Sequence, residues 1–75
     1  MELFERVVLL EDLPNTTFIK GDIATVVEIY NGKQGYEIEF FAADGTTLGV
    51  ETVSADMVMS CKGIKGVLHI HDIAA

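Results

Sequence analysis

The chain has 75 residues, enough for one domain with a small core, and 49% of them are hydrophobic, too many for a disordered segment. Twelve acidic residues against five basic ones give a formal net charge of −7, which argues against binding to nucleic-acid phosphates or to an anionic membrane. No apolar run approaches the roughly 20 residues of a membrane span, and the N-terminal residues carry acids where a signal peptide carries bases. We therefore expect a cytoplasmic protein.

The first predicted strand covers residues 5–10, ERVVLL. Its apolar run fits a strand or a helix by periodicity, but it is short and contains two β-branched residues, which favours a strand. A loop is expected over residues 11–17, because Pro14 has no amide hydrogen for a sheet and Asn15 favours turns. Phe18 and Ile19 follow this loop and are expected to fold back onto the core.

The longest predicted strand covers residues 23–30, IATVVEIY, directly after a turn at residues 20–22. Alternation of side chains gives it two partly apolar faces. One face carries the odd-numbered residues from 23 to 29, and the other carries the even-numbered residues from 24 to 30. Such a strand suits a small curved sheet.

Two hairpins are predicted next. Asn31-Gly32 is a strong hairpin signal and opens the connection to a strand over residues 36–41. In that strand the alternation predicts that Tyr36, Ile38 and Phe40 face the core. Glu37 and Glu39 then face water, and Phe41 falls on their side as a partly exposed aromatic residue.

The second hairpin turns at Asp44-Gly45 and returns as a strand over residues 46–53, with Leu48, Val50 and Thr52 predicted to point inward. Residues 54–56 then suggest one 3₁₀ turn, followed by a fifth strand over residues 57–61. This order predicts an all-β fold, a small SH3-like barrel of about five strands formed by residues 1–62.

Residues 63–75 form a tail beyond the predicted barrel. Its segment VLHIHDI at 67–73 has strong β character and is too apolar to remain in solvent. We expect it to be an extra strand that packs on its own barrel or joins a neighbouring molecule, which would give a homo-oligomer.

Several short motifs recur in an order that resembles a bacterial family of unknown function, the DUF4926 proteins. They are LEDLP at 10–14, KGD at 20–22, ATVVE at 24–28 and YEIEF at 36–40. The chain departs from the family in Ala24, where a glycine is usual, and in the tail from Lys62 onward. The resemblance implies a compact SH3-like fold and supplies no activity or catalytic residues.

The turn and valine-rich strand at 20–30 also look like the KOW element of ribosomal and transcription factors. The chain lacks the basic residues that the RNA-binding versions use.

The candidate binding residues are acidic or aromatic. Acids of the first loop would form an acidic rim, and exposed aromatic residues at strand ends are favoured at interfaces. The predicted protein-binding residues are Glu11, Asp12, Asp22, Tyr30 and Phe41.

Catalytic and metal-binding signals are weak. Cys61 has no base beside it and is expected to be a small buried residue, while Glu37 and Glu39 read as a solvated strand face. His69 and His71 share one face of the tail segment, where they could hold a metal only with further ligands. No cofactor is expected, and no metal site is assigned.

These observations predict a non-enzymatic protein–protein interaction module, an adaptor or antitoxin-like protein that binds a basic partner. The alternatives are a KOW-like nucleic-acid-binding module and weak metal binding through the C-terminal histidines.

Overall fold

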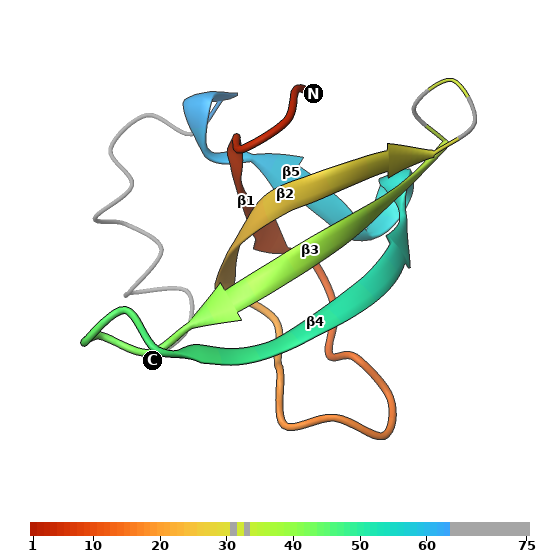
Figure 1. The fold of residues 1–75 in the computed structure, drawn as a ribbon. Coiled ribbons are helices and arrows are strands. Elements are labelled where there is room, and N and C mark those ends of the chain that lie inside the picture. The colour runs from red at the N-terminus through yellow and green to blue at the C-terminus, as the bar shows by residue number, and fades with distance from the viewer. Residues whose placement is uncertain (31, 33, 64–75) are drawn as a thin grey trace.

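Five antiparallel strands account for most of the regular structure in the computed structural model, which describes residues 1–30, 32 and 34–63 (Figure 1). The elements are β1 (Arg6–Leu9), β2 (Ile23–Tyr30), β3 (Gly35–Phe41), β4 (Thr47–Ser54), the 3₁₀ turn η2 (Ala55–Met57), β5 (Val58–Ser60) and the 3₁₀ turn η3 (Cys61–Gly63). The all-β prediction is confirmed, and each strand lies within about two residues of its predicted range. The predicted tail strand lies outside the described residues.

The strands form one sheet in the order β4-β3-β2-β1-β5. The sheet is strongly bent, so that β1 and β5 lie behind β2 and β3 in the view of Figure 1. Within the described residues β4 and β5 remain edge strands, and the predicted barrel is therefore an open, curved sheet. No helix in this part of the chain is long and apolar enough to cross a membrane.

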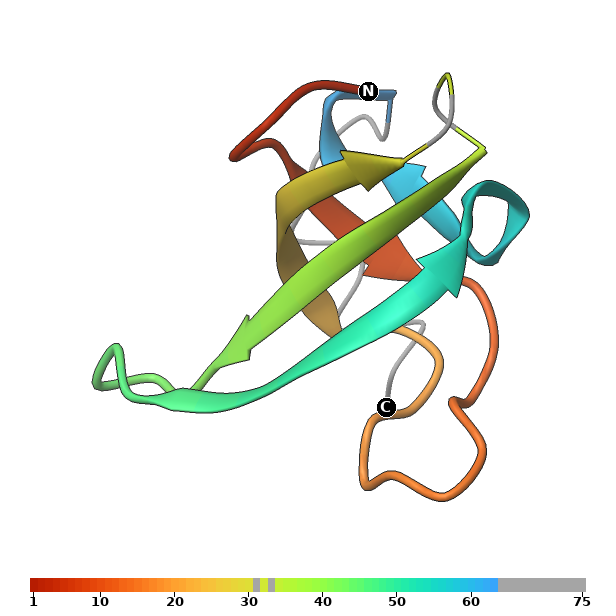
Figure 2. The ribbon, with the colours of Figure 1, turned by 45° about the vertical axis from the view of Figure 1, so that its right-hand side comes forward.

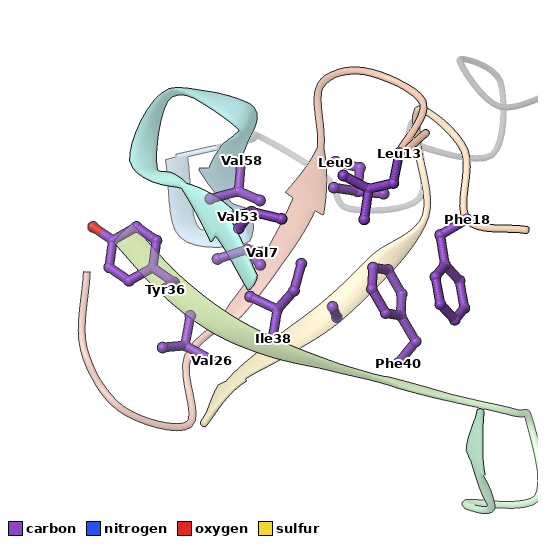
Figure 3. Close-up of a cluster of buried hydrophobic side chains, with 11 residues drawn as sticks. Val7, Leu9, Leu13, Phe18, Val26, Tyr36, Ile38, Phe40, Val53 and Val58 are labelled. Carbon is purple, nitrogen blue, oxygen red and sulfur yellow. The ribbon is translucent and has the colours of Figure 1, made fainter. Parts of the chain in front are cut away.

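The core fills the concave side of the bent sheet (Figure 3). Val7, Val26 and Ile38 have no measurable exposure, and Tyr36 and Phe40 extend the same layer along β3. The predicted inward face of β3 is thus confirmed. No polar or charged side chain is buried among the described residues, so the core is held by apolar packing alone.

A bulge divides the long strand β2. Val26 pairs with Ile38 but Glu28 pairs with Glu37, so Val27 is an extra residue in the ladder. Ala24 and Val26 face the core before the bulge, whereas Ile29 packs against it afterwards. The predicted uniform alternation along residues 23–30 is therefore wrong beyond Val26.

The predicted inward face of β4 is also wrong. Leu48 and Val50 are exposed by 59% and 46%, and Thr52 is exposed as well. The register instead turns Gly49 and Val53 toward the core, because they pair with Phe40 and Tyr36. A register shift beside Phe40 accompanies this reversal.

The first loop, residues 10–22, covers the part of the core that the side chains of β4 leave uncovered. Phe18 stacks on Phe40 with ring centroids 3.8 Å apart and planes 7° from parallel, and Leu13 is buried beside it. Figure 3 shows both loop side chains directed at the sheet. Phe18 folds onto the core as predicted, but Ile19 does not, because it is about half exposed.

Gly49 makes this stack possible. A Cβ atom at this position would lie 3.2 Å and 3.3 Å from two ring atoms of Phe18. Aromatic cover of an edge glycine is a common way to pin a strand register.

We predict that Gly49→Val lowers the free energy of unfolding by about 1–3 kcal/mol, because the added side chain must displace the Phe18 ring. Urea unfolding measures this loss. In a Phe18→Ala background the same substitution should cost much less. An equal cost in both backgrounds would contradict the role given to Phe18.

Candidate functional site

The convex side of the sheet, called here the outer face, carries one chemically varied row of residues. Strand pairing aligns Arg6 with Thr25, Thr25 with Glu39, and Glu39 with Val50. Neighbouring strands lie about 4.8 Å apart, so the row passes from a cation to an acid to an apolar side chain within about 15 Å. The outer face therefore offers different groups to a ligand over a short distance.

A groove of about 530 Å³ opens at one end of this row. Its lining comes from β1, β2, the end of β3 and the turn that follows. The lining residues are Arg6, Ile23, Ala24, Thr25, Phe41, Ala42, Ala43 and Gly45. Ile23, Phe41, Ala42 and Ala43 give the groove apolar side chains, so it suits an apolar group beside a single cation.

The turn that forms one side of the groove is built as the sequence predicts. Asp44 accepts a hydrogen bond from the Thr46 amide at 2.9 Å, and this bond holds the pKa of its carboxyl below the ordinary value. Gly45 has a φ of 89°, which a residue with a side chain adopts only with strain. In Figure 2 this turn forms the tip of the β3–β4 hairpin.

Exposed apolar side chains continue from the groove across the hairpin. Phe41, Leu48 and Val50 are named here the hairpin patch, and Phe41 is 44% exposed. Phe41 also lines the groove, so groove and patch form one surface. The partial exposure predicted for Phe41 is confirmed, whereas Leu48 and Val50 were not predicted as site residues.

Carboxylates lie beside the patch on β2 and β3. Glu28 is directly opposite Glu37 in the ladder, an arrangement of like charges that destabilises a sheet. Glu39 accepts a hydrogen bond from the Thr47 hydroxyl at 2.6 Å, and Glu37 accepts one from the Tyr30 hydroxyl at 3.4 Å. The outer face therefore combines apolar side chains with a cluster of negative charge.

The acids predicted in the first loop have structural contacts. Asp12 accepts a hydrogen bond from the Lys20 amide at 2.8 Å, and Asp22 accepts one from the Ile19 amide at 2.9 Å. Glu11 is exposed beside them. Asp12 and Asp22 thus hold the loop in shape, and each uses one oxygen to do so.

The two predicted aromatic residues do not form one site. Tyr30 ends β2 opposite Gly35, whereas Phe41 ends β3 six residues further on, about 20 Å away along the strand. Asp22 immediately precedes β2 and lies at the Phe41 end. The pKa of the Tyr30 hydroxyl is raised, first by partial desolvation and then by the negative charge of Glu37.

The N-terminal residues form a second exposed apolar feature that the sequence analysis missed. Phe4 has a φ of 66° and is 73% exposed, and its amide donates to the Val26 carbonyl at 2.6 Å. Leu3 beside it is half exposed. Glu5 anchors the segment, because it accepts hydrogen bonds from the Ser60 hydroxyl and from the Glu2 amide.

Cys61 is a packing residue in this region. It is buried against Val8 and Ile23, as predicted. Burial raises the pKa of its thiol, the positive charge of Arg6 opposes the shift, and Glu5 adds to it. A thiol in such a setting is mostly protonated and a poor nucleophile near neutral pH.

Metal ligands do not gather within the described residues, where no three His, Cys, Asp or Glu side chains could share an ion. His69 and His71 lie outside that part of the chain.

We predict that Ser60→Ala raises the pKa of Glu5 toward its ordinary value, because the Ser60 hydrogen bond is the main cause of the lowered pKa. A lowered folded-state pKa contributes stability above the unfolded pKa, and this stability is lost as pH falls through the folded value. The variant should therefore be less stable than the wild type at neutral pH, with a smaller difference near about pH 2. Carboxyl NMR titration and urea unfolding measure both effects.

Ser54→Ala is the matched control for this experiment. It removes the Ser54 hydrogen bond to Asp56 and leaves Glu5 untouched. An unchanged Glu5 pKa in Ser60→Ala would refute the assignment.

We also predict that the native protein reacts with a thiol reagent far more slowly than the urea-unfolded chain, because Cys61 is buried with a raised pKa. Absorbance of the released chromophore follows the reaction. Equal rates in the two states would show that Cys61 is accessible.

Comparison with known proteins places the chain in a family. No curated protein and no solved structure matches it. A family model matches residues 3–60, which include all five strands and the outer face described above. The chain belongs to the DUF4926 family, a domain of unknown function.

Proposed function

We propose that this chain is a non-enzymatic protein-binding module whose outer face binds a basic partner protein. The observation that carries the proposal is the hairpin patch, in which Phe41, Leu48 and Val50 remain exposed beside Glu37 and Glu39. Apolar side chains supply binding energy when a partner covers them, and the surrounding charge selects the partner. An adaptor or an antitoxin-like protein would use such a surface.

The charge of the chain favours a basic partner. A formal net charge of −7 attracts a positively charged surface over a distance and raises the rate of encounter. At close range a partner cation near Glu28 and Glu37 would offset the repulsion between these opposed carboxylates. The negative cluster therefore gains more from a basic partner than from a neutral one.

We place the proposed centre of binding on the hairpin and not on the first loop. Asp12 and Asp22 accept hydrogen bonds from loop amides, whereas Glu39 lies opposite the exposed Val50. Phe41 and Asp22 remain part of the proposed surface because they lie at its groove end. Tyr30 would take part only in a partner long enough to reach the other end of the hairpin.

Nucleic-acid binding is the weaker alternative. Arg6 and Lys62 line one groove, but Glu2 and Glu5 line it too, so the local charge is balanced. Such a site does not present the excess of cations that phosphate binding requires.

The cytoplasm is the proposed compartment. A single buried cysteine fits its reducing conditions.

We predict that a Phe41→Ser, Leu48→Ser double variant loses the protein partner that the wild type recovers from a cell extract in a pull-down. Both residues are exposed, so the fold should persist, which circular dichroism checks. The matched control is Leu10→Ser, Ile19→Ser, which removes two comparably exposed apolar residues from the first loop.

The proposal requires that the recovered partner be basic and that the loop variant retain it. Loss of the partner from the loop variant alone would return the binding site to the first loop. Recovery of the same partner by all three proteins would refute the hairpin patch as the site.

A further inference from the structure

Edge strand β4 is the longer of the two edge strands in the described part of the sheet. It spans eight residues, and within the described residues it has a neighbour only on its β3 side. Natural proteins protect such edges with proline, lysine, inward-pointing charges, bulges or very short strands. β4 has one inward-pointing charge, Glu51, and a register shift near its start. β4 contains neither proline nor lysine, whereas the opposite edge, β5, is only three residues long.

The side chains of β4 specify what could pair with it. Leu48 and Val50 extend from the outer face, where an added strand could cover them with apolar residues. Glu51 faces the other way, because it pairs with the buried Ile38, and it remains half-buried at the rim. Residues directly opposite each other on paired strands lie about 5 Å apart, so a lysine or arginine opposite Glu51 would form an ion pair.

A second copy of the chain fits this edge poorly. It would bring a net charge of −7 against another −7. A strand with alternating apolar and basic residues meets both the exposed apolar groups and the negative charge.

We propose that β4 accepts an extended, basic segment of a partner protein by strand addition, with apolar residues over Leu48 and Val50 and a basic residue opposite Glu51. This inference rests on the proposed function and adds the mode of binding. Backbone hydrogen bonds to the edge of β4 that has no neighbour among the described residues would supply part of the affinity, and the alternating side chains would supply the specificity.

The experiment uses the full chain and a fluorescent peptide of about nine alternating valine and lysine residues with blocked ends, read by fluorescence anisotropy. Val50→Lys should weaken binding at least about tenfold, because it places a cation on the pairing edge. Met59→Lys is the matched control, since Met59 on β5 is 42% exposed and the charge change is the same. It should alter the affinity by less than about twofold.

Two further peptides test strand addition itself. One carries methyl groups on the backbone nitrogens of the valines, and the other carries them on those of the lysines. Because an added strand turns alternate amides toward β4, at least one of these peptides should bind about tenfold more weakly than the parent.

The failures are distinguishable. If the parent peptide binds and Val50→Lys weakens it, but both methylated peptides bind equally well, strand addition is refuted and the proposed function stands. If the parent peptide does not bind, strand addition to β4 is refuted, and the pull-down with the hairpin variant decides the proposed function separately. If sedimentation shows a wild-type dimer that Val50→Lys abolishes, a second copy occupies β4 and the inference is overturned.

Discussion

The stack of Phe18 on Phe40 across Gly49 is the contact on which the rest of the structure depends. A five-stranded open sheet of this length cannot enclose its own concave side near β4, where Gly49 contributes no side chain to the core. The first loop closes this gap, and its Asp12 and Asp22 carboxylates hold the loop in the required shape through backbone amides. Because the loop covers the inner side of β4, the apolar residues of β4 are free to face outward.

Two irregularities in the strand pairing affect which side chains face outward. The bulge at Val27 lets Ile29 reach the core while Glu28 stays opposite Glu37 on the outer face. The register shift beside Phe40 leaves Leu48 exposed at the far end of the hairpin. Bulges re-aim side chains without ending a strand, so the sheet keeps its hydrogen bonds while its two faces change composition. The bulge thus adds Glu28 to the acidic cluster of the outer face.

The sequence predicts the strands well and the faces less well, for physical reasons. The alternation of apolar and acidic residues in 36–41 predicts a strand with one buried face, and the structure confirms this prediction. In residues 46–53 the alternation predicts that Leu48 and Val50 face the core, and this prediction is wrong. Alternation along a strand contains no information about a side chain that a distant loop packs onto the sheet. Gly49 was the available signal, since a glycine inside a strand indicates a bulge or a close approach. Phe41 could be identified as exposed from local pattern alone, whereas Leu48 and Val50 required the tertiary contact.

A long edge strand such as β4 can pair with other chains and cause aggregation. A net charge of −7 opposes contact between two copies, so a long strand with one neighbour among the described residues is less hazardous here than it would be in a neutral protein. The same charge cannot repel a basic segment. Repulsion between copies and attraction for the proposed basic partner therefore arise from one property, the negative charge of the chain.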